Sequence, residues 1–463
     1  MEAIISGINW LDDFIWGMPM IVLLLGTHLF MTVRTGFIQR KTFTGILLSV
    51  RKDPDAPGDV SQFQALTTAL ASTIGTGNIV GACGAIIVGG PGAIFWLWVT
   101  ALIGMCTKYA EVTLAVKFRE RNKHGDWVGG PMYYIRNGLG KNWKWLAVIF
   151  CIFGGLASFG IGNAVQVGNI TDSVNTAIQA FIPSAAESAD TINLVLGVVL
   201  MIIVGIVLLG GIKRIGSVTE KLVPIMAAIY IIACLVVVFA NITDVPRVFG
   251  MIFKGAFTPE GVTGGAVGIT IKLCITWGVK RGVFSNEAGL GSAPIAHAAS
   301  SESNPVKQGL YGIFEVFMDT IVICSLSGLT ILVALTEEQL NYGVQGTTAL
   351  NSQALGTVFG DKIGALIIAI GLSLFALSTV LSWGLYGTRC WEYILGTKAI
   401  KPYQVIFTLV VLVGATIDLG LAWDIADTLN GLMAIPNLIA IFALSGVVFK
   451  CTKEFFDREK LAK

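Results

Sequence analysis

Long apolar runs recur along the whole chain, and they constrain its fold more than any other feature. A bilayer-spanning helix needs about 20 predominantly apolar residues, and we count eleven runs of this kind. Only 13% of the 463 residues are charged and 54% are hydrophobic, whereas a soluble domain is about one quarter charged. The sequence therefore predicts an all-α membrane protein with eleven transmembrane helices. The runs occupy residues 15–33, 62–87, 92–116, 145–169, 192–211, 222–240, 262–281, 308–335, 363–388, 403–422 and 427–449.

Basic residues are distributed unevenly between the two sides that these runs would separate. With the N-terminus outside, most of the 31 Lys and Arg residues fall in cytoplasmic segments, as the positive-inside rule requires. We therefore expect a multi-pass protein of the cell (inner) membrane, with a cytoplasmic C-terminus and no nucleic-acid partner. Acidic rather than basic residues precede the first run, so we expect that span to be retained and not cleaved as a signal peptide. The segments expected in the cytoplasm are 34–60, 117–144, 212–221, 280–307, 389–401 and 450–463.

The residue types that build catalytic and metal centres are scarce and scattered. The three histidines, His28, His124 and His297, have no metal-ligand spacing. The eight cysteines form no CxxC motif and predict neither a zinc site nor a disulfide framework. These observations argue against a membrane enzyme and against an organic cofactor. A channel is a second alternative, but no loop resembles a selectivity filter.

The segment 71–81, ASTIGTGNIVG, interrupts the second apolar run. Glycines and polar side chains at membrane depth predict an unwound backbone, which is tolerated only where protein or water satisfies it. Unwinding around Gly75 and Gly77 would free amides at the start of a half-helix, where the helix dipole favours a carboxylate. The carbonyls of the first half and the Asn78 side chain would suit a small hard cation. The alternative is that the glycines permit close helix packing, but packing does not require the polar residues among them.

The ten runs that follow the first divide into two sets of five. Because five is an odd number, the second set must cross the membrane inverted relative to the first. Paired interruptions in two such halves indicate a transporter site near the bilayer midplane, and a second glycine-rich segment, 264–282, opens the second set. We expect a broken helix there too. The predicted parts are an extra transmembrane helix with a cytoplasmic amphipathic connector (1–60), two five-helix repeats (61–240 and 262–450) and a cytoplasmic tail (451–463).

Polar clusters in two other runs have two interpretations each. Ser378 and Thr379 in the ninth run would supply two hydroxyl oxygens to one cation, or would bond carbonyls of their own helix. Asn163 and Gln166 in the fourth run share a helical face. That face lines the pocket or bonds neighbouring helices.

Charged residues within or beside the runs are functional candidates by default. Lys108 and Glu111 have the spacing of a local ion pair. Glu315 and Asp319, four residues apart, would offer proton coupling as an alternative to sodium coupling.

Residues 89–104, GGPGAIFWLWVTALIG, closely resemble the signature of the alanine or glycine:cation symporter family. Leu97 stands where the family pattern usually has methionine. The run 285–291, SNEAGLG, is also similar, and the resemblance extends over essentially the whole chain. It implies a leucine-transporter-type fold with five-plus-five inverted repeats, preceded by one extra N-terminal helix. It also implies a symporter that imports alanine and/or glycine by alternating access, with Na⁺ as the co-transported ion.

The resemblance further implies which residues hold the transported species, and it assigns no catalytic residue. The implied sodium ligands are the carbonyls of Ala71, Ile74 and Phe375 and the hydroxyls of Ser378 and Thr379. The implied substrate site comprises Gly75, Thr76 and Gly77 at the carboxylate, and Thr276, Trp277 and Gly278 at the amine, where a second break would free carbonyls. The remaining substrate candidates are Asn78, Asn163 and Gln166. A possible second sodium site would use Thr73 and Asn78. The preference between alanine and glycine, the ion stoichiometry and the oligomeric state stay open.

Overall fold

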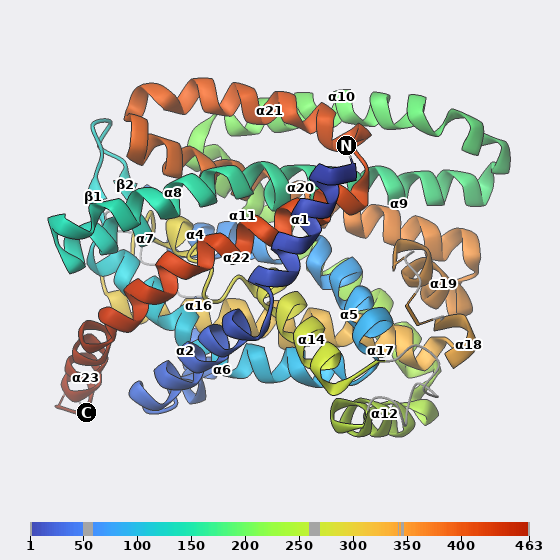
Figure 1. Ribbon diagram of the computed structural model, residues 1–463, viewed down its shortest axis with the longest axis horizontal. Coiled ribbons are helices and arrows are strands. Elements are labelled where there is room, and N and C mark those ends of the chain that lie inside the picture. The colour runs from blue at the N-terminus through green and yellow to red at the C-terminus, as the bar shows by residue number, and fades with distance from the viewer. Residues whose placement is uncertain (1, 50–58, 259–268, 341, 344–346, 462–463) are drawn as a thin grey trace.

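The computed structural model describes residues 2–49, 59–258, 269–340, 342–343 and 347–461. Helices dominate these residues (Figure 1). Eight helices are long and apolar enough to cross a membrane, or up to ten if each of two sharply bent pairs is one span. This agrees with the prediction of a membrane protein, although it does not establish the number eleven.

Most helices of the first half are long, and several contain a short π-helical or 3₁₀ segment. They are α1 (Glu2–Ile15), α2 (Met18–Arg34), η1 (Ile38–Lys41), α3 (Thr42–Ser49), α4 (Gln62–Thr73), η2 (Gly77–Gly81), α5 (Ala82–Gly89), α6 (Ala93–Lys117), α7 (Pro131–Tyr134), η3 (Ile135–Leu139), η4 (Lys141–Trp143), α8 (Lys144–Phe159), η5 (Gly160–Ala164), α9 (Val165–Phe181), η6 (Pro183–Ser188), α10 (Ala189–Leu208), α11 (Gly211–Ala240), η7 (Ile242–Asp244) and α12 (Val245–Phe257).

The second half contains the longest helix, α20, which crosses the centre of the molecule and packs against α4, α8, α9 and α19. The helices of this half are α14 (Ile271–Asn286), α15 (Pro294–His297), α16 (Pro305–Val316), η8 (Phe317–Cys324), α17 (Ser325–Ala334), α18 (Glu337–Leu340), α19 (Thr347–Phe359), α20 (Asp361–Leu395), η9 (Thr397–Ala399), α21 (Ile400–Thr416), α22 (Leu419–Ala443) and α23 (Ser445–Leu461).

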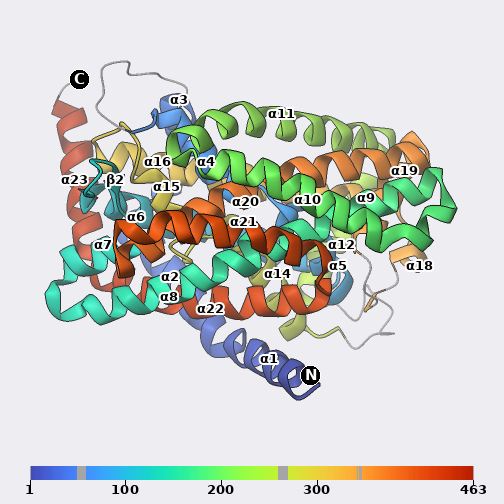
Figure 2. The ribbon, with the colours of Figure 1, turned by 90° about the horizontal axis from the view of Figure 1, so that it is seen from above.

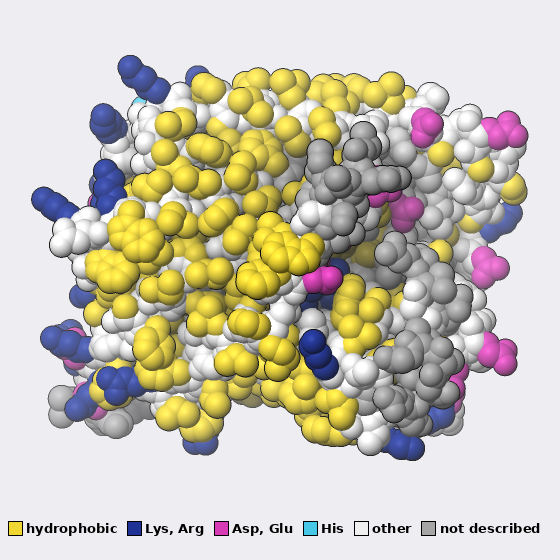
Figure 3. All heavy atoms as spheres, viewed as in Figure 1, with side chains coloured by type: hydrophobic (Ala, Val, Ile, Leu, Met, Phe, Trp, Pro, Cys, Tyr) yellow, Lys and Arg dark blue, Asp and Glu magenta, His cyan; other side chains and the backbone are white. Residues whose placement is uncertain are grey.

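The visible surface is divided into zones by side-chain type. A broad hydrophobic band covers its middle, while most Lys and Arg side chains gather at the edge that carries β1, β2 and the C-terminus (Figures 1 and 3). Acidic side chains are frequent at the opposite edge, near α18 and α19. Exposed apolar surface of this extent is what a lipid-facing belt requires. The basic edge is the one expected to face the cytoplasm.

Three expectations about the elements need correction. The fold is not entirely helical, because Glu120–Arg121 and Trp127–Val128 pair as the antiparallel strands β1 and β2 around a turn at Gly125, whose φ is +85°. The seventh predicted run ends too early at residue 281, because α14 continues to Asn286. The helices α21 and α22 also begin before the corresponding predicted runs, 403–422 and 427–449. A separate helix, α23, follows α22.

Candidate functional site

The helix that was predicted to break does break. α4 ends at Thr73, Ile74 leaves the helical region with ψ of 83°, and the chain resumes at Gly77 in a direction bent by 48°. The Gly75 N–H donates to Asn78 Oδ1 at 2.8 Å instead of continuing the helix. All residues from Ala71 to Gly81 are buried. A buried backbone interruption satisfied by protein groups is how a membrane protein builds an internal polar site.

Glycine is needed at two positions of this break. A Cβ built on Gly75 would lie 2.5 Å from Thr379 Oγ1, and one built on Gly77 would lie 3.0 Å from Phe284 Cδ1. The break therefore contacts α20 on one side and α14 on the other. Both glycines therefore also permit close packing of these helices, the alternative interpretation of this segment.

Four of the five predicted sodium ligands converge. Ser378 Oγ and Thr379 Oγ1 lie 3.2 and 3.0 Å from the carbonyl oxygen of Ala71, to which they donate. The same hydroxyls also donate to the carbonyl of Phe375 within α20, at 2.8 and 3.1 Å. Oxygens at these separations fit around one hard cation whose ligands stand about 2.3–2.6 Å away. The hydroxyls thus bond a carbonyl of their own helix, as one interpretation expected, and the geometry leaves their role as cation ligands a prediction. Ile74, the fifth residue, is buried at the break itself.

The predicted substrate residues are only partly brought together. Gln166 Oε1 accepts from the Thr76 N–H at 3.3 Å, and the buried Thr76 hydroxyl has no partner among the described residues. Asn163, in contrast, donates to the carbonyl of Phe407 on α21 at 2.8 Å, and so its amide nitrogen bonds a neighbouring helix. Of this pair, Gln166 is the one placed against the break.

The expected interruption at Thr276–Gly278 is wrong. α14 is a continuous helix from Ile271 to Asn286, so its carbonyls at these positions are not freed; residues 264–268 lie outside the described part of the chain. The glycine here serves packing, because a Cβ on Gly278 would lie 2.6 Å from the carbonyl oxygen of Ala93. The Trp277 ring lies against the guanidinium of Arg281 at 4.9 Å rather than over the first break.

The described break of the second half comes later, at SNEAGLG. Glu287 adopts a left-handed conformation with φ of 56°, and Gly289 and Gly291 follow with φ of 91° and 82°. Non-glycine residues rarely adopt such angles, which marks this segment as constrained by its surroundings. Ser285 and Phe284, just before it, are the residues that face Gly77.

Asp319 lies at the junction of the two breaks. Its carboxylate accepts from Asn78 Nδ2 at 2.6 Å, Ser285 Oγ at 2.9 Å and Thr320 Oγ1 at 2.7 Å, and it is fully buried. No basic side chain of the described residues pairs with it within 4.0 Å. From the sequence, Asp319 was an ionisable residue inside a run and a candidate for proton coupling. Its partner Asn78 belongs to the predicted second sodium site.

A second group of charges lies on the side of α1. Lys280 Nζ is 2.6 Å from Asp12 Oδ2 and 2.9 Å from Asp427 Oδ2, and Arg281 pairs with Asp427 at 3.2 Å. These residues come from α1, α14 and α22. Figure 2 shows α1 projecting from the rest of the molecule, with its C-terminal end returning to this cluster. Lys280 and Arg281, which the sequence predicts in a cytoplasmic segment, are both buried.

Aromatic rings continue this cluster toward the first break. The Arg281 guanidinium stands 4.5 Å over the Trp423 ring, and Trp423 lies 4.7 Å from Phe284. Phe284 is the ring that touches Gly77. Ion pairs and rings thus form a continuous layer over one side of the site.

Such a fold and site, with a broken helix bound to a long central helix inside an apolar bundle, define a membrane transporter. The sequence matches the model of the Sodium:alanine symporter family over residues 1–463, and the chain belongs to that family. It is a transporter and not an enzyme.

Two relatives illustrate the match. The chain is 47% identical to the "Sodium/alanine symporter AgcS" of Methanococcus maripaludis, covering 98% of each sequence. It is 46% identical to an "Uncharacterized transporter" of Haemophilus influenzae, covering 100% of this chain and 97% of that one. Among solved structures, the fold resembles MhsT in complex with L-phenylalanine, with a TM-score of 0.60, 14% identity, and coverage of 85% of this chain and 98% of the other. This likeness shows that the two chains share a fold.

Proposed function

We propose that this protein is a sodium-coupled symporter that imports alanine and/or glycine across the cell membrane by alternating access. The observation that carries the proposal is the meeting of Ser378 and Thr379 with the Ala71 carbonyl beside the break at Gly75. A hard cation bound there would bridge α4 and α20. The Methanococcus relative is named a sodium/alanine symporter.

The substrate carboxylate would meet the amides of Gly75, Thr76 and Gly77, close to the bound sodium. Gln166 holds the Thr76 amide in the present geometry, so substrate binding would exchange that hydrogen bond for one to the carboxylate. Phe284 closes the other side of the break. We therefore assign to this ring the steric limit that admits a small side chain.

A second sodium position would use the Thr73 carbonyl, Asn78 and Asp319. A buried carboxylate with only neutral donors is costly unless it is protonated or meets a cation. Proton coupling through Asp319 is the competing function. The name of one Bacillus subtilis relative, "Putative sodium/proton-dependent alanine carrier protein YrbD", includes both ions.

If the N-terminus lies outside, the outer gate would be the group of ion pairs formed by Asp12, Lys280, Arg281 and Asp427. It covers the site from the side that carries α1. In an alternating-access cycle this layer would open when the inner side is closed.

The test is uptake by the purified protein in liposomes. An inward sodium gradient should concentrate labelled alanine inside, and replacing Na⁺ by choline at fixed pH should abolish accumulation. Competition by unlabelled glycine and larger neutral amino acids would measure the size limit. Accumulation of alanine driven by a proton gradient in a choline medium would favour proton coupling. Alanine uptake that never exceeds the external concentration would indicate a channel.

A further inference from the structure

Glu287, the residue in the left-handed conformation at the second break, is surrounded by oxygen atoms. Its Oε2 accepts from Ser292 Oγ at 2.6 Å and from Ser72 Oγ at 3.4 Å, and Ser72 Oγ lies 2.8 Å from the hydroxyl of Tyr386. The indole nitrogen of Trp383 donates to Oε1 at 2.8 Å and holds the carboxylate in place. All these side chains are buried. Apart from this indole N–H, the groups around the carboxylate present hydroxyl oxygens, the ligand type that suits a hard cation.

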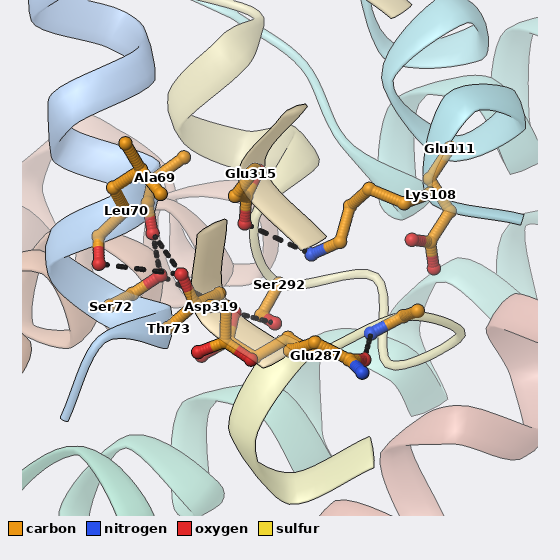
Figure 4. Close-up of polar contacts among 12 residues, drawn as sticks. Ala69, Leu70, Ser72, Thr73, Lys108, Glu111, Glu287, Ser292, Glu315 and Asp319 are labelled. Carbon is orange, nitrogen blue, oxygen red and sulfur yellow. Dashed lines mark hydrogen bonds and ion pairs between the residues drawn. The ribbon is translucent and has the colours of Figure 1, made fainter. Parts of the chain in front are cut away.

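The charges around Glu287 are not balanced. Lys108 is the buried ammonium of this region, and it pairs with Glu315 at 3.2 Å, as Figure 4 shows. Glu315 also accepts from His297 at 2.9 Å. Glu287 has no basic partner within 4.0 Å among the described residues, and neither has Glu111. The predicted local pair of Lys108 with Glu111 is therefore wrong, because α16 brings a better-placed carboxylate to the ammonium.

The position of Glu287 relative to the sodium site follows from two helices. Ser72 is the residue after Ala71, and Trp383 is four residues after Thr379 on α20, a rise of about 6 Å. Arg389, near the same end of α20, pairs with Asp126, which lies in the β1–β2 hairpin at the basic edge. Glu287 thus lies about one helical turn from the sodium ligands, toward the side expected to face the cytoplasm.

A second observation points to a ligand on this face of α20. The hydroxyl of Ser382 is fully buried and has no hydrogen-bond partner among the described residues. Ser382 is four residues after Ser378, on the same face of α20. An unsatisfied buried hydroxyl on that face is what a passing ion would use.

We propose that Glu287, with Ser72, Ser292 and Tyr386, forms an inner cation-binding position that receives sodium from the Ala71–Thr379 site and releases it to the cytoplasm. The proposal rests on the sodium symport proposed above. It requires the Glu287 carboxylate to be ionised when the ion arrives, because the negative charge is what draws the cation inward. A protonated, purely structural Glu287 is the competing interpretation.

The experiment compares net uptake with exchange. Net uptake into sodium-free liposomes requires sodium release inside, whereas exchange of labelled for unlabelled alanine, at saturating sodium on both sides, does not. Glu287→Gln keeps a hydrogen-bonding side chain of the same size and removes the charge. We expect its net uptake to fall about tenfold or more, equivalent to about 1.4 kcal/mol in the barrier, while exchange stays within about twofold of the unmodified protein.

Two controls make the result specific. Glu111→Gln removes another buried carboxylate that has only neutral partners, the Gly289 amide and Asn437, and should change net uptake and exchange by the same factor. Glu287→Asp keeps the charge and should recover part of the net uptake. Sodium-dependent binding of labelled alanine to each purified variant confirms that it is folded.

The outcomes distinguish failure of the inner cation-binding position from failure of the proposed sodium site. If Glu287→Gln takes up alanine like the unmodified protein, or loses exchange as much as net uptake, the inner position is refuted. If a variant of the Thr379 site keeps normal sodium dependence, the proposed sodium site fails instead, whatever Glu287→Gln does.

Discussion

Replacing Thr379 by valine tests the sodium site with the smallest change of shape. The substitution keeps the branched side chain and removes one hydroxyl, which lies 3.0 Å from the Ala71 carbonyl and 3.1 Å from that of Phe375. Without sodium, the loss is a neutral hydrogen bond of about 1 kcal/mol. With sodium bound, the lost contact is to a charge and is worth about 1.5–3 kcal/mol.

These magnitudes predict a selective effect. The sodium concentration for half-maximal alanine binding should rise about 2- to 30-fold, since the two losses differ by about 0.5–2 kcal/mol and 1.4 kcal/mol is tenfold in affinity. Alanine affinity at saturating sodium should change little, because the hydroxyl is assigned to the ion. The assay is binding of labelled alanine to the purified protein across a sodium titration, with choline keeping ionic strength constant.

The same helix offers a matched control. Thr388 donates to the carbonyl of Gly384 at 2.6 Å, a bond within the helix like that of Thr379, and it is buried. Thr388→Val should leave the sodium titration unchanged. A normal sodium midpoint in Thr379→Val, or an equal shift in both variants, would refute the assignment of this hydroxyl to the ion.

Three further predictions concern the rest of the site. Gly75→Ala should abolish sodium-dependent alanine binding, because its Cβ would lie 2.5 Å from the Thr379 hydroxyl, whereas Gly26→Ala, which meets nothing within 4 Å, should bind normally. Asp427→Asn removes the shared partner of two basic side chains and should speed the release of bound alanine about tenfold or more, as breaking a buried pair is costly; unchanged release would exclude an outer gate. Asp319→Asn should lower the Hill coefficient for sodium toward about 1, and an unchanged steep titration would argue against a second sodium at this carboxylate.

The first break was predictable from sequence because its signal is local. Glycines and polar residues together at membrane depth leave few structures other than a buried, unwound backbone. The pairing of this break with Ser378 and Thr379 needed the family resemblance, since about 300 residues separate them and no spacing rule connects them. The structure brings these groups within hydrogen-bond distance.

The second break was misplaced because glycine has two uses that sequence alone does not separate. Gly278 and Gly282 lie in a continuous helix and allow close approach to α6, where a Cβ would meet Ala93 and Thr100. Gly289 and Gly291 instead hold positive φ angles. The choice between packing and unwinding depends on what the neighbouring helix presents, which is a property of the fold.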